Sequence, residues 1–161
     1  MVIAVGDRLP KARFTIMTAS GPAPKSTDEI FGGKLSALFA VPGAFTPTCH
    51  RNHLPGFLEN ADALKAKGID QIVCTSTNDI FVLTAWAAAS GAADKIVFIS
   101  DGNGDFAKAI GLDNDGTPNN MGIRSKRYAM LVEDGVVKIL NIEDGPGKAD
   151  ISSAVSLLAG L

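Results

Sequence analysis

Cys49 is the residue of this chain whose position most favours chemistry. It follows residues 35–41, an apolar run that predicts a buried strand, and it precedes apolar residues at helical spacing. A tight turn containing Pro and Gly joins the two, which places Cys49 in or near the first turn of a helix. There the backbone N–H groups lack partners and the helix dipole is positive, and both effects stabilise a thiolate. We therefore expect Cys49 to be a nucleophilic cysteine.

A reactive thiolate needs groups that orient the attacked atom, balance its charge and exclude water. Thr46 lies three residues upstream, close enough for its hydroxyl to face the same pocket as the sulfur. Pro42 and Pro47 stiffen the turn and remove N–H donors, which helps to shield the thiolate. The cation must come from elsewhere, and we predict Arg124, because it precedes a strand in a fold whose strand ends build sites. Arg127 is the competing candidate.

A metal site and inert packing are the alternatives for these residues. His50 and His53 lie close to Cys49, but a structural zinc site needs four ligands in paired clusters, and Cys74 is the only other thiol. We therefore predict no metal, and we interpret His53 as a hydrogen-bonded helix residue. A lone cysteine is often a small hydrophobe, yet the Pro-rich turn before Cys49 is hard to explain by packing.

The elements that must position these residues follow from the periodicity of the apolar residues. Strands are predicted at residues 13–17, 35–41, 69–76, 96–100, 127–132 and 136–142. Helices are predicted after residue 48 and at residues 78–90, 105–110 and 151–161. Alternating strands and helices imply parallel pairing with right-handed crossovers, and the turn Glu133-Asp134-Gly135 adds an antiparallel hairpin. The predicted fold class is α/β, a three-layer α/β/α sandwich around a mixed sheet.

Local signals refine the ends of these elements. Thr48 is expected to cap the helix that carries the cysteine, and Gly68 to end it. Pro55 falls inside the helical pattern and predicts a kink or a break. Residues 19–25 read as a turn, and residues 113–120 read as a surface loop because they are almost devoid of apolar side chains.

The bulk properties describe one ordinary globular domain over residues 1–161. The net charge of −2 gives no reason to expect nucleic acid or an anionic membrane as a partner. No apolar run is long enough to span a membrane, and no signal or transit segment is recognisable, although a processed form would hide one. A chain with two cysteines is not a disulfide scaffold, so we predict a reducing compartment, the cytoplasm.

The turn before Cys49 carries a recognisable motif. Pro42-x-x-x-Thr46-x-x-Cys49 is the signature of the peroxiredoxins, thiol peroxidases of the redoxin group with a thioredoxin-like fold. The full sequence of residues 41–49 resembles that of the peroxiredoxin-five subfamily, which includes the plant type II enzymes. Further matching segments are Gly6-Asp7-x-Leu9-Pro10, His53-Leu54-Pro55-Gly56-Phe57, Ala63-Leu64-Lys65-Ala66-Lys67-Gly68, Gly122-Ile123-Arg124-Ser125-Lys126-Arg127-Tyr128 and Val132-Glu133-Asp134-Gly135. The resemblance covers essentially the whole chain.

The resemblance implies a role for each residue of the motif. Cys49 would be the peroxidatic nucleophile, Thr46 would hydrogen-bond the peroxide, Arg124 would hold thiolate and substrate, and Pro42 would shield the sulfur. It implies reduction of hydrogen peroxide and organic hydroperoxides in antioxidant defence and cell redox homeostasis, with Cys49 oxidised to a sulfenic acid. It implies no cofactor.

The thiol that resets Cys49 is a separate question. The animal branch of the subfamily has a resolving cysteine near the C-terminus, and residues 144–161 contain none. Cys74 matches the spacing of the second cysteine in the plant-like branch, but it falls in a predicted buried strand, where a thiol is ordinarily a small hydrophobe. A disulfide also needs Cα atoms within about 7 Å. We favour an external thiol, either glutathione with glutaredoxin or thioredoxin, and Cys74 as the resolving cysteine is the alternative.

The resemblance also implies a homodimer packed beside the active site, through Phe45, Ile80 and Phe81. By their helical spacing alone, Phe81 and Trp86 are most simply core or interface anchors.

Two other functions compete with a peroxidase. One is a redox sensor that signals through oxidation of Cys49, and the other is a disulfide reductase, which is disfavoured because no Cys-x-x-Cys occurs.

Overall fold

The computed structural model describes residues 1–145 and 147–161. Within them, seven strands form one sheet in the order β2-β1-β5-β4-β3-β8-β9. The strands are β1 (Arg13–Thr18), β2 (Gly21–Ser26), β3 (Leu35–Ala40), β4 (Gln71–Ser76), β5 (Val97–Ser100), β8 (Tyr128–Glu133) and β9 (Val136–Ile142). The pairs β3–β4 and β4–β5 are parallel and the other pairs are antiparallel, which confirms the predicted mixed sheet.

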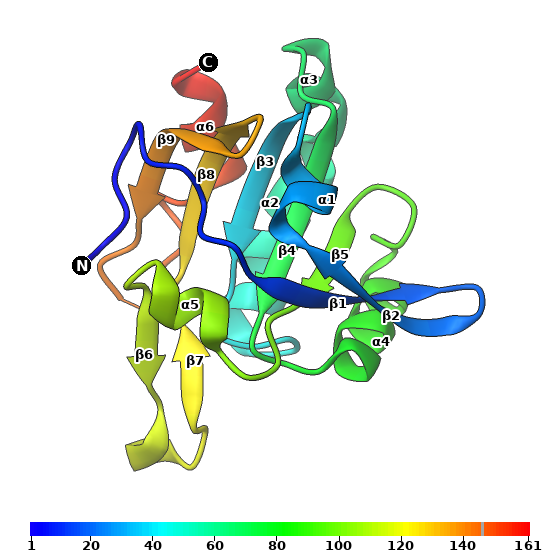
Figure 1. Cartoon of the computed structure of the whole chain (residues 1–161), viewed down its shortest axis with the longest axis vertical. Helices are drawn as coiled ribbons and strands as arrows, with labels where there is room; N and C mark the ends of the chain where they lie inside the picture. The colour runs from blue at the N-terminus through cyan, green and yellow to red at the C-terminus, as the bar shows by residue number, and fades with distance from the viewer. Residues whose placement is uncertain (146) are drawn as a thin grey trace.

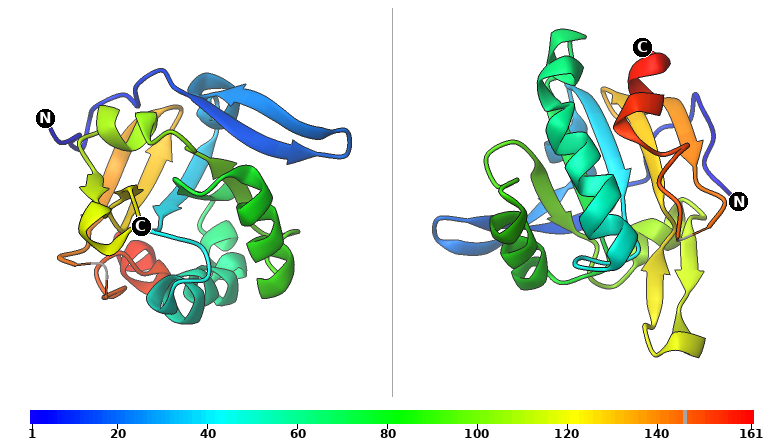
Figure 2. Two further views of the ribbon diagram at one scale, coloured as in Figure 1. Left: turned by 90° about the horizontal axis from the view of Figure 1, so that it is seen from below. Right: turned by 180° about the vertical axis from the view of Figure 1, so that it is seen from behind.

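Helices cover both faces of this sheet (Figures 1 and 2). They are α1 (Thr27–Phe31), α2 (Leu54–Glu59), α3 (Ala61–Ala66), α4 (Ile80–Ser90), α5 (Asp105–Ala109) and α6 (Ala154–Ala159). The apolar residues of α2, α3, α4 and α6 pack on one face, and those of α1 and α5 pack on the other. The three-layer sandwich is therefore confirmed. Among the described residues, no helix is both long and apolar enough to cross a bilayer.

The strand β3 shows why its sequence is an unbroken apolar run. Phe39 belongs to the cluster of buried residues on one face of the sheet, and Leu38 belongs to the cluster on the other face. Side chains alternate between the two faces of a strand, so a strand covered on both faces needs apolar residues throughout. Because β3 lies between β4 and β8 in the sheet, it fixes the position of the turn that follows it.

Residues 19–25 differ from the prediction, because most of them form an edge strand rather than a turn. β2 pairs with β1 from Gly21 opposite Thr18 to Ser26 opposite Arg13. Proline lacks an N–H, but an edge strand has one side without a partner and tolerates it. Helix α1 follows directly, and Ser26 and Glu29 form a reciprocal capping box at its start. The spacing of Ser26 and Glu29 is the sequence signal for this capping box.

The predicted surface loop at residues 113–120 also contains structure. β6 (Asp113–Asp115) pairs antiparallel with β7 (Ile123–Ser125), and a short 3-10 turn, Thr117–Asn119, lies between them. This pair projects from the body of the molecule below the main sheet in Figure 1. Its residues are mostly polar and do not alternate, so they carry no strand signal.

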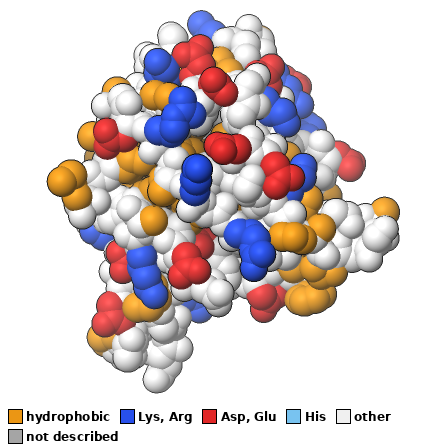
Figure 3. Space-filling model, in the orientation of Figure 1, with side chains coloured by type: hydrophobic (Ala, Val, Ile, Leu, Met, Phe, Trp, Pro, Cys, Tyr) orange, Lys and Arg blue, Asp and Glu red, His pale blue; other side chains and the backbone are white. Residues whose placement is uncertain are grey.

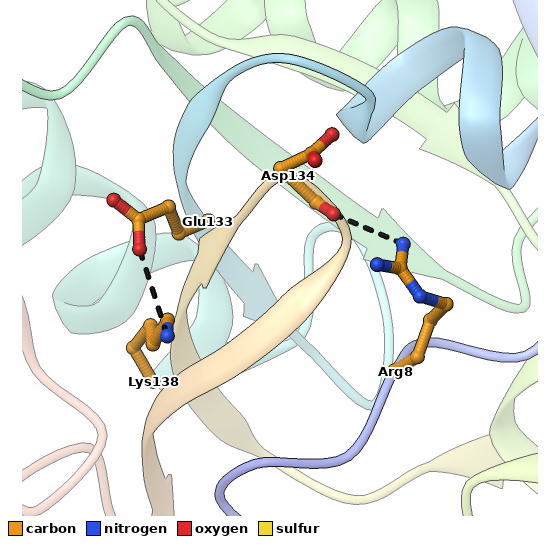
Figure 4. A network of polar contacts seen from close by, with 4 residues as sticks. All are labelled: Arg8, Glu133, Asp134 and Lys138. Atoms are coloured by element: carbon orange, nitrogen blue, oxygen red, sulfur yellow. Dashed lines mark hydrogen bonds and ion pairs between the residues drawn. The ribbon is translucent and has the colours of Figure 1, made fainter.

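The predicted hairpin between β8 and β9 is confirmed. Asp134 and Gly135 have φ angles of 47° and 79°, the left-handed values that a tight hairpin turn requires. Arg8 donates a hydrogen bond from Nη1 to the carbonyl of Asp134 at 3.1 Å, and Lys138 lies 3.6 Å from the carboxylate of Glu133 (Figure 4). The N-terminal arm is thus tied to the hairpin, which fixes β8 and β9 at one side of the sheet.

Candidate active site

Helical hydrogen bonding begins just before Cys49. The N–H of His50 donates to the carbonyl of Thr46 at 2.8 Å. Thr48 has a helical backbone, with φ −69° and ψ −40°, and its side chain makes no capping hydrogen bond. The prediction of Thr48 as N-cap is therefore wrong, because this residue already lies inside the helical turn. The position of Cys49 in the first turn is confirmed.

Cys49 opens a π-helical turn, Cys49–His53. The N–H of Leu54 donates to the carbonyl of Cys49, five residues back rather than the four of an α-helix. Pro55 follows at the start of α2, and it has no N–H to continue either pattern. The predicted interruption at Pro55 is confirmed, as a widened turn before the proline. Gly68, with φ 95°, follows α3 as predicted.

The turn between β3 and Cys49 has one conformation that is fixed by close contacts. Phe45 has φ 61°, a left-handed value that is uncommon for a residue with a Cβ. The hydroxyl of Thr46 donates to the carbonyl of Gly43 at 2.6 Å. A Cβ at Gly43 would lie 2.8 Å from Nη1 of Arg124, so a larger residue there would force the guanidinium of Arg124 to shift. Strain of this kind persists where the surroundings hold it in place, and it is common at functional sites.

Arg127 supplies the cation at the sulfur. Its Nη2 donates to Sγ of Cys49 at 2.9 Å, and its Nη1 lies 3.0 Å from Nδ1 of His53. All three side chains are buried. A guanidinium is charged at every accessible pH, and in a buried site it favours a thiolate over a thiol. Arg127, the competing candidate from the sequence, is therefore the arginine that contacts the nucleophile.

Arg124, the arginine that we predicted at the thiolate, lies elsewhere. Its Nη1 donates to the carbonyl of Pro42 at 3.2 Å and its Nε donates to the carbonyl of Met121 at 2.8 Å. It belongs to β7 of the small projecting pair, and from there it supports the backbone of the turn. Arg127 immediately precedes Tyr128, the first residue of β8.

The pairing of β8 with β3 explains the choice of arginine. Tyr128 lies opposite Ala40, the last residue of β3, so the residue before Tyr128 reaches the turn that carries Cys49. A sequence signal existed, because Arg127 directly adjoins an apolar strand, but its use required the antiparallel partner of that strand. The prediction of Arg124 is corrected on this ground.

His53 is a neutral acceptor beside the arginine. Burial, and then the positive charge of Arg127, lower the pKa of His53 to about 3. Its Nε2 lies 2.9 Å from the carbonyl of Ser152, which can only accept, so Nε2 carries the proton and Nδ1 accepts from Arg127. The expected hydrogen-bonded helix histidine is confirmed, but its contact with Arg127 was not foreseen.

Cys74 is buried in β4, with Phe39 and Phe98 as its partners in the neighbouring strands. Burial raises the pKa of the Cys74 thiol well above its ordinary value, and the neighbouring Cys49 raises it further. Both cysteines are free thiols. Cys74 is thus a protonated thiol in the core, as expected for a small hydrophobe in a strand.

An aromatic group joins the active-site turn to α4. Nε1 of Trp86 donates to Nδ1 of His50 at 3.0 Å, and the ring of Phe45 lies 5.6 Å from that of His50. Trp86 is fully buried and is a core residue, whereas Phe81 on the same helix is 64% exposed. Ile80, predicted as part of a dimer contact, is buried in the core.

Within the described part of the chain, no three His, Cys, Asp or Glu side chains come together as a metal site would need.

A buried cysteine at the start of a helix, held by an arginine on a mixed sheet with helices on both faces, defines a thiol-dependent enzyme of thioredoxin-like fold. The model of the Redoxin family matches residues 4–158. The chain belongs to this family and, within it, to the type II peroxiredoxins, which are thiol-dependent peroxidases.

Individual relatives agree with this assignment. The chain is 46% identical to the chloroplastic Peroxiredoxin-2E-2 of Oryza sativa subsp. japonica, over 99% of this chain and 72% of the relative. It is 40% identical to Peroxiredoxin-2B of Arabidopsis thaliana, over 99% of this chain and 98% of the relative. The crystal structure of reduced Prx3 from Vibrio vulnificus in complex with H2O2 superposes with a TM-score of 0.93, at 46% identity and with 99% of each chain covered. The thioredoxin-like fold and the peroxidase chemistry are therefore confirmed.

Proposed function

We propose that the chain reduces hydrogen peroxide and small organic hydroperoxides through Cys49. The contact of 2.9 Å between Nη2 of Arg127 and Sγ of Cys49 carries this proposal. The thiolate attacks the terminal peroxide oxygen, so that an S–O bond forms and the O–O bond breaks. Cys49 is oxidised to a sulfenic acid, which keeps the terminal oxygen, and the second peroxide oxygen leaves with the bond electrons and takes a proton to become water or an alcohol. The Vibrio vulnificus relative, crystallised with H2O2, supports the choice of substrate.

Arg127 and Thr46 share the work on the peroxide. The fixed positive charge of Arg127 stabilises the thiolate and the charge that develops on the leaving oxygen. Thr46 already donates its proton to the carbonyl of Gly43 at 2.6 Å, so its oxygen is left to accept a hydrogen bond from the peroxide O–H. Pro42 is buried, adds no N–H donor and shields the sulfur from water.

The variant Thr46→Val tests the role of the hydroxyl. Valine has nearly the same shape but cannot accept from the peroxide, so the second-order rate constant with hydrogen peroxide should fall by about 10- to 100-fold. Stopped-flow mixing with peroxide measures it. Thr48→Val is the matched control, because Thr48 lies two residues further on and its side chain makes no capping hydrogen bond. This variant should react at close to the wild-type rate. A normal rate in Thr46→Val would remove this hydroxyl from the mechanism.

An external thiol resets the enzyme in this proposal. Cys74 is a protonated thiol within a central strand, and a resolving role would require it to leave that strand or Cys49 to leave its turn. A thiol of glutathione, glutaredoxin or thioredoxin would instead attack the sulfenic acid, releasing water and forming a mixed disulfide that a second thiol reduces. A cytoplasmic location belongs to the same proposal, because this cycle needs a reducing compartment.

Turnover with both reducing systems side by side decides which thiol acts. Peroxide consumption is followed with glutathione plus glutaredoxin and, separately, with thioredoxin plus its reductase. Sustained turnover in either system supports the proposal and identifies the reductant. Oxidation of one thiol per chain without turnover in either system would instead favour a redox sensor.

A homodimer beside the active site is the remaining part of the proposal. Phe81 on α4 is 64% exposed and Phe45 on the active-site turn is 49% exposed, and the ring of Phe45 lies 6.5 Å from that of Trp86 on the same helix. In Figure 3, hydrophobic side chains gather over α4 and the adjoining hairpin of β1 and β2. Exposed apolar surface of this kind marks an interface. Val82, 36% exposed on the same helix, would contribute to this contact in place of the buried Ile80 that the resemblance implied.

The variant Phe81→Glu tests this interface. Burial of a charged carboxylate between two copies is costly, so the variant should sediment as a monomer at micromolar concentration where the wild type sediments as a dimer. Val155→Glu is the matched control, because Val155 is 65% exposed on α6, which lies far from α4 in Figure 1. This control variant should remain dimeric. A monomeric wild type would overturn the proposed dimer.

A further inference from the structure

A closed ring of hydrogen bonds begins and ends at Arg127. Its carbonyl accepts from the N–H of Glu143 at 3.0 Å. The carboxylate of Glu143 accepts from the N–H of Ser152 at 2.8 Å and from its hydroxyl at 2.7 Å. The carbonyl of Ser152 lies 2.9 Å from Nε2 of His53, and Nδ1 of His53 lies 3.0 Å from Nη1 of Arg127. The ring therefore joins the backbone of one residue to its own side chain.

Each bond of this ring has one direction. Burial alone would raise the pKa of Glu143, but the hydrogen bonds from Ser152 and from the backbone of Ile151 and Asp150 together hold that pKa below its usual value, so the carboxylate only accepts. The carbonyl of Ser152 also only accepts, which fixes the proton of His53 on Nε2 and leaves Nδ1 as an acceptor. The guanidinium of Arg127 only donates. The two nitrogens of His53 cannot exchange roles while the ring is closed.

The ring lies out of solvent and ties together distant parts of the chain. The side chains of His53, Arg127, Glu143 and Ser152 are all buried, with exposed fractions of 7% or less. His53 ends the π-helical turn, Glu143 directly follows β9, and Ser152 precedes α6. The segment before α6 therefore supports the active-site arginine through His53.

The last bond of the ring falls on the guanidinium that contacts the nucleophile. Nη1 of Arg127 points to His53, and Nη2 of the same planar group points to Cys49. Because the guanidinium is rigid, an acceptor that holds one nitrogen also fixes the direction of the other. The orientation of the donor at Sγ thus depends on the acceptor at Nδ1.

We propose that Glu143 and Ser152 are positioning residues of the peroxidatic centre, which act through His53 to aim Arg127 at Cys49. This inference rests on the proposed role of Arg127 in the reaction. Both residues act at a distance from the sulfur, and no local sequence pattern connects them with it. Outer-sphere hydrogen bonds of this kind typically change rates through the group that they orient.

The variant Glu143→Gln tests the proposal. Both bonds from Ser152 end on one carboxylate oxygen, which an amide can supply, but the NH₂ of the amide then replaces the oxygen that accepts from the N–H of Ile151 at 3.4 Å. Two donors would face each other there, and the charge that strengthens the bonds from Ser152 is lost. The second-order rate constant with hydrogen peroxide should fall by about tenfold, the size of coupling found within one hydrogen-bond network. Alkylation of Cys49 by iodoacetamide should fall by only about twofold, because no peroxide has to be aligned. Equal falls in the two rates, or no fall, would overturn the proposal.

A pair of adjacent serines separates positioning from stability. Ser152→Ala removes the hydroxyl bond to Glu143 but keeps the N–H and the carbonyl, so its peroxide rate should fall by about threefold. Ser153→Ala removes the N-cap of α6, whose side chain accepts from Ser156, and should lower the melting temperature without changing the peroxide rate. If Glu143→Gln does not fold, this pair still decides the question. Equal peroxide rates in the two serine variants would count against positioning.

The double variant with Arg127→Ala distinguishes this inference from the proposed function. When the guanidinium is absent, Glu143→Gln should cause no further loss of peroxide rate, because residues that act as a unit are not additive. A further tenfold loss would show a role independent of Arg127 and would overturn the inference. If Arg127→Ala alone reacted at the wild-type rate, the proposed role of the arginine would fail first.

Discussion

Replacement of Arg127 by alanine is expected to lower the rate constant for reaction with hydrogen peroxide by about 10²- to 10³-fold. The guanidinium lies 2.9 Å from Sγ of Cys49, so its loss removes the charge that favours the thiolate and the donor that steadies the leaving oxygen. The remaining thiol would also be buried without its cation. Rapid-mixing measurement of sulfenic acid formation, with thiol titration at each time, gives the rate.

Arg124→Ala is the matched control for this experiment. Its described hydrogen bonds go to the carbonyls of Pro42 and Met121, so its loss relaxes the turn by bonds worth about 1 kcal/mol each, and the rate should stay within about fivefold of wild type. The two arginines are three residues apart, and the sequence alone favoured Arg124. A severe loss in Arg124→Ala together with a mild one in Arg127→Ala would reverse the assignment made from the structure.

Cys49→Ser is expected to abolish peroxide turnover, whereas Cys74→Ser should retain most of it. A serine hydroxyl at the first position has no usable anionic form near neutral pH, so no nucleophile remains. Cys74 is a buried, protonated thiol, and its replacement exchanges one small core side chain for another while the nucleophile stays in place. Peroxide consumption by both variants, with an external thiol supplied, measures the difference.

Mass spectrometry after oxidation by one equivalent of peroxide completes this test. The wild type should carry a sulfenic acid at Cys49 or a mixed disulfide with the added thiol. A bridge between Cys49 and Cys74, combined with lost turnover in Cys74→Ser, would make Cys74 the resolving cysteine and would replace the external thiol in the proposed cycle.

The central part of the fold could be predicted because burial leaves a regular imprint on the sequence. The strand β3 is apolar throughout because both faces are covered, and the hairpin at Asp134 and Gly135 needs left-handed backbone that few residues adopt. The helix after Cys49 was recognisable from its apolar spacing. These signals are local, so no knowledge of partners is required.

The missed features depend on partners that the sequence does not name. β2 is a strand only because β1 lies beside it, and its prolines are tolerated only at the edge of a sheet. The choice between Arg124 and Arg127 depends on the register of β8 against β3, which a chain read in order does not reveal. Glu143 and Cys49 are nearly a hundred residues apart in the sequence. The hydrogen bonds that connect them join the π-helical turn, the end of β9 and the start of α6, so no local pattern marks the connection.

The π-helical turn at Cys49 has a consequence for how the buried sulfur is held. Such a turn holds one residue more than the α-helix around it, and each residue accounts for about 100° of rotation about the helix axis. If the extra residue passed out of the helix, Cys49 would turn about the helix axis by about that angle relative to Arg127. The contact between Sγ of Cys49 and the guanidinium of Arg127 is thus sensitive to a slip of one residue in this turn.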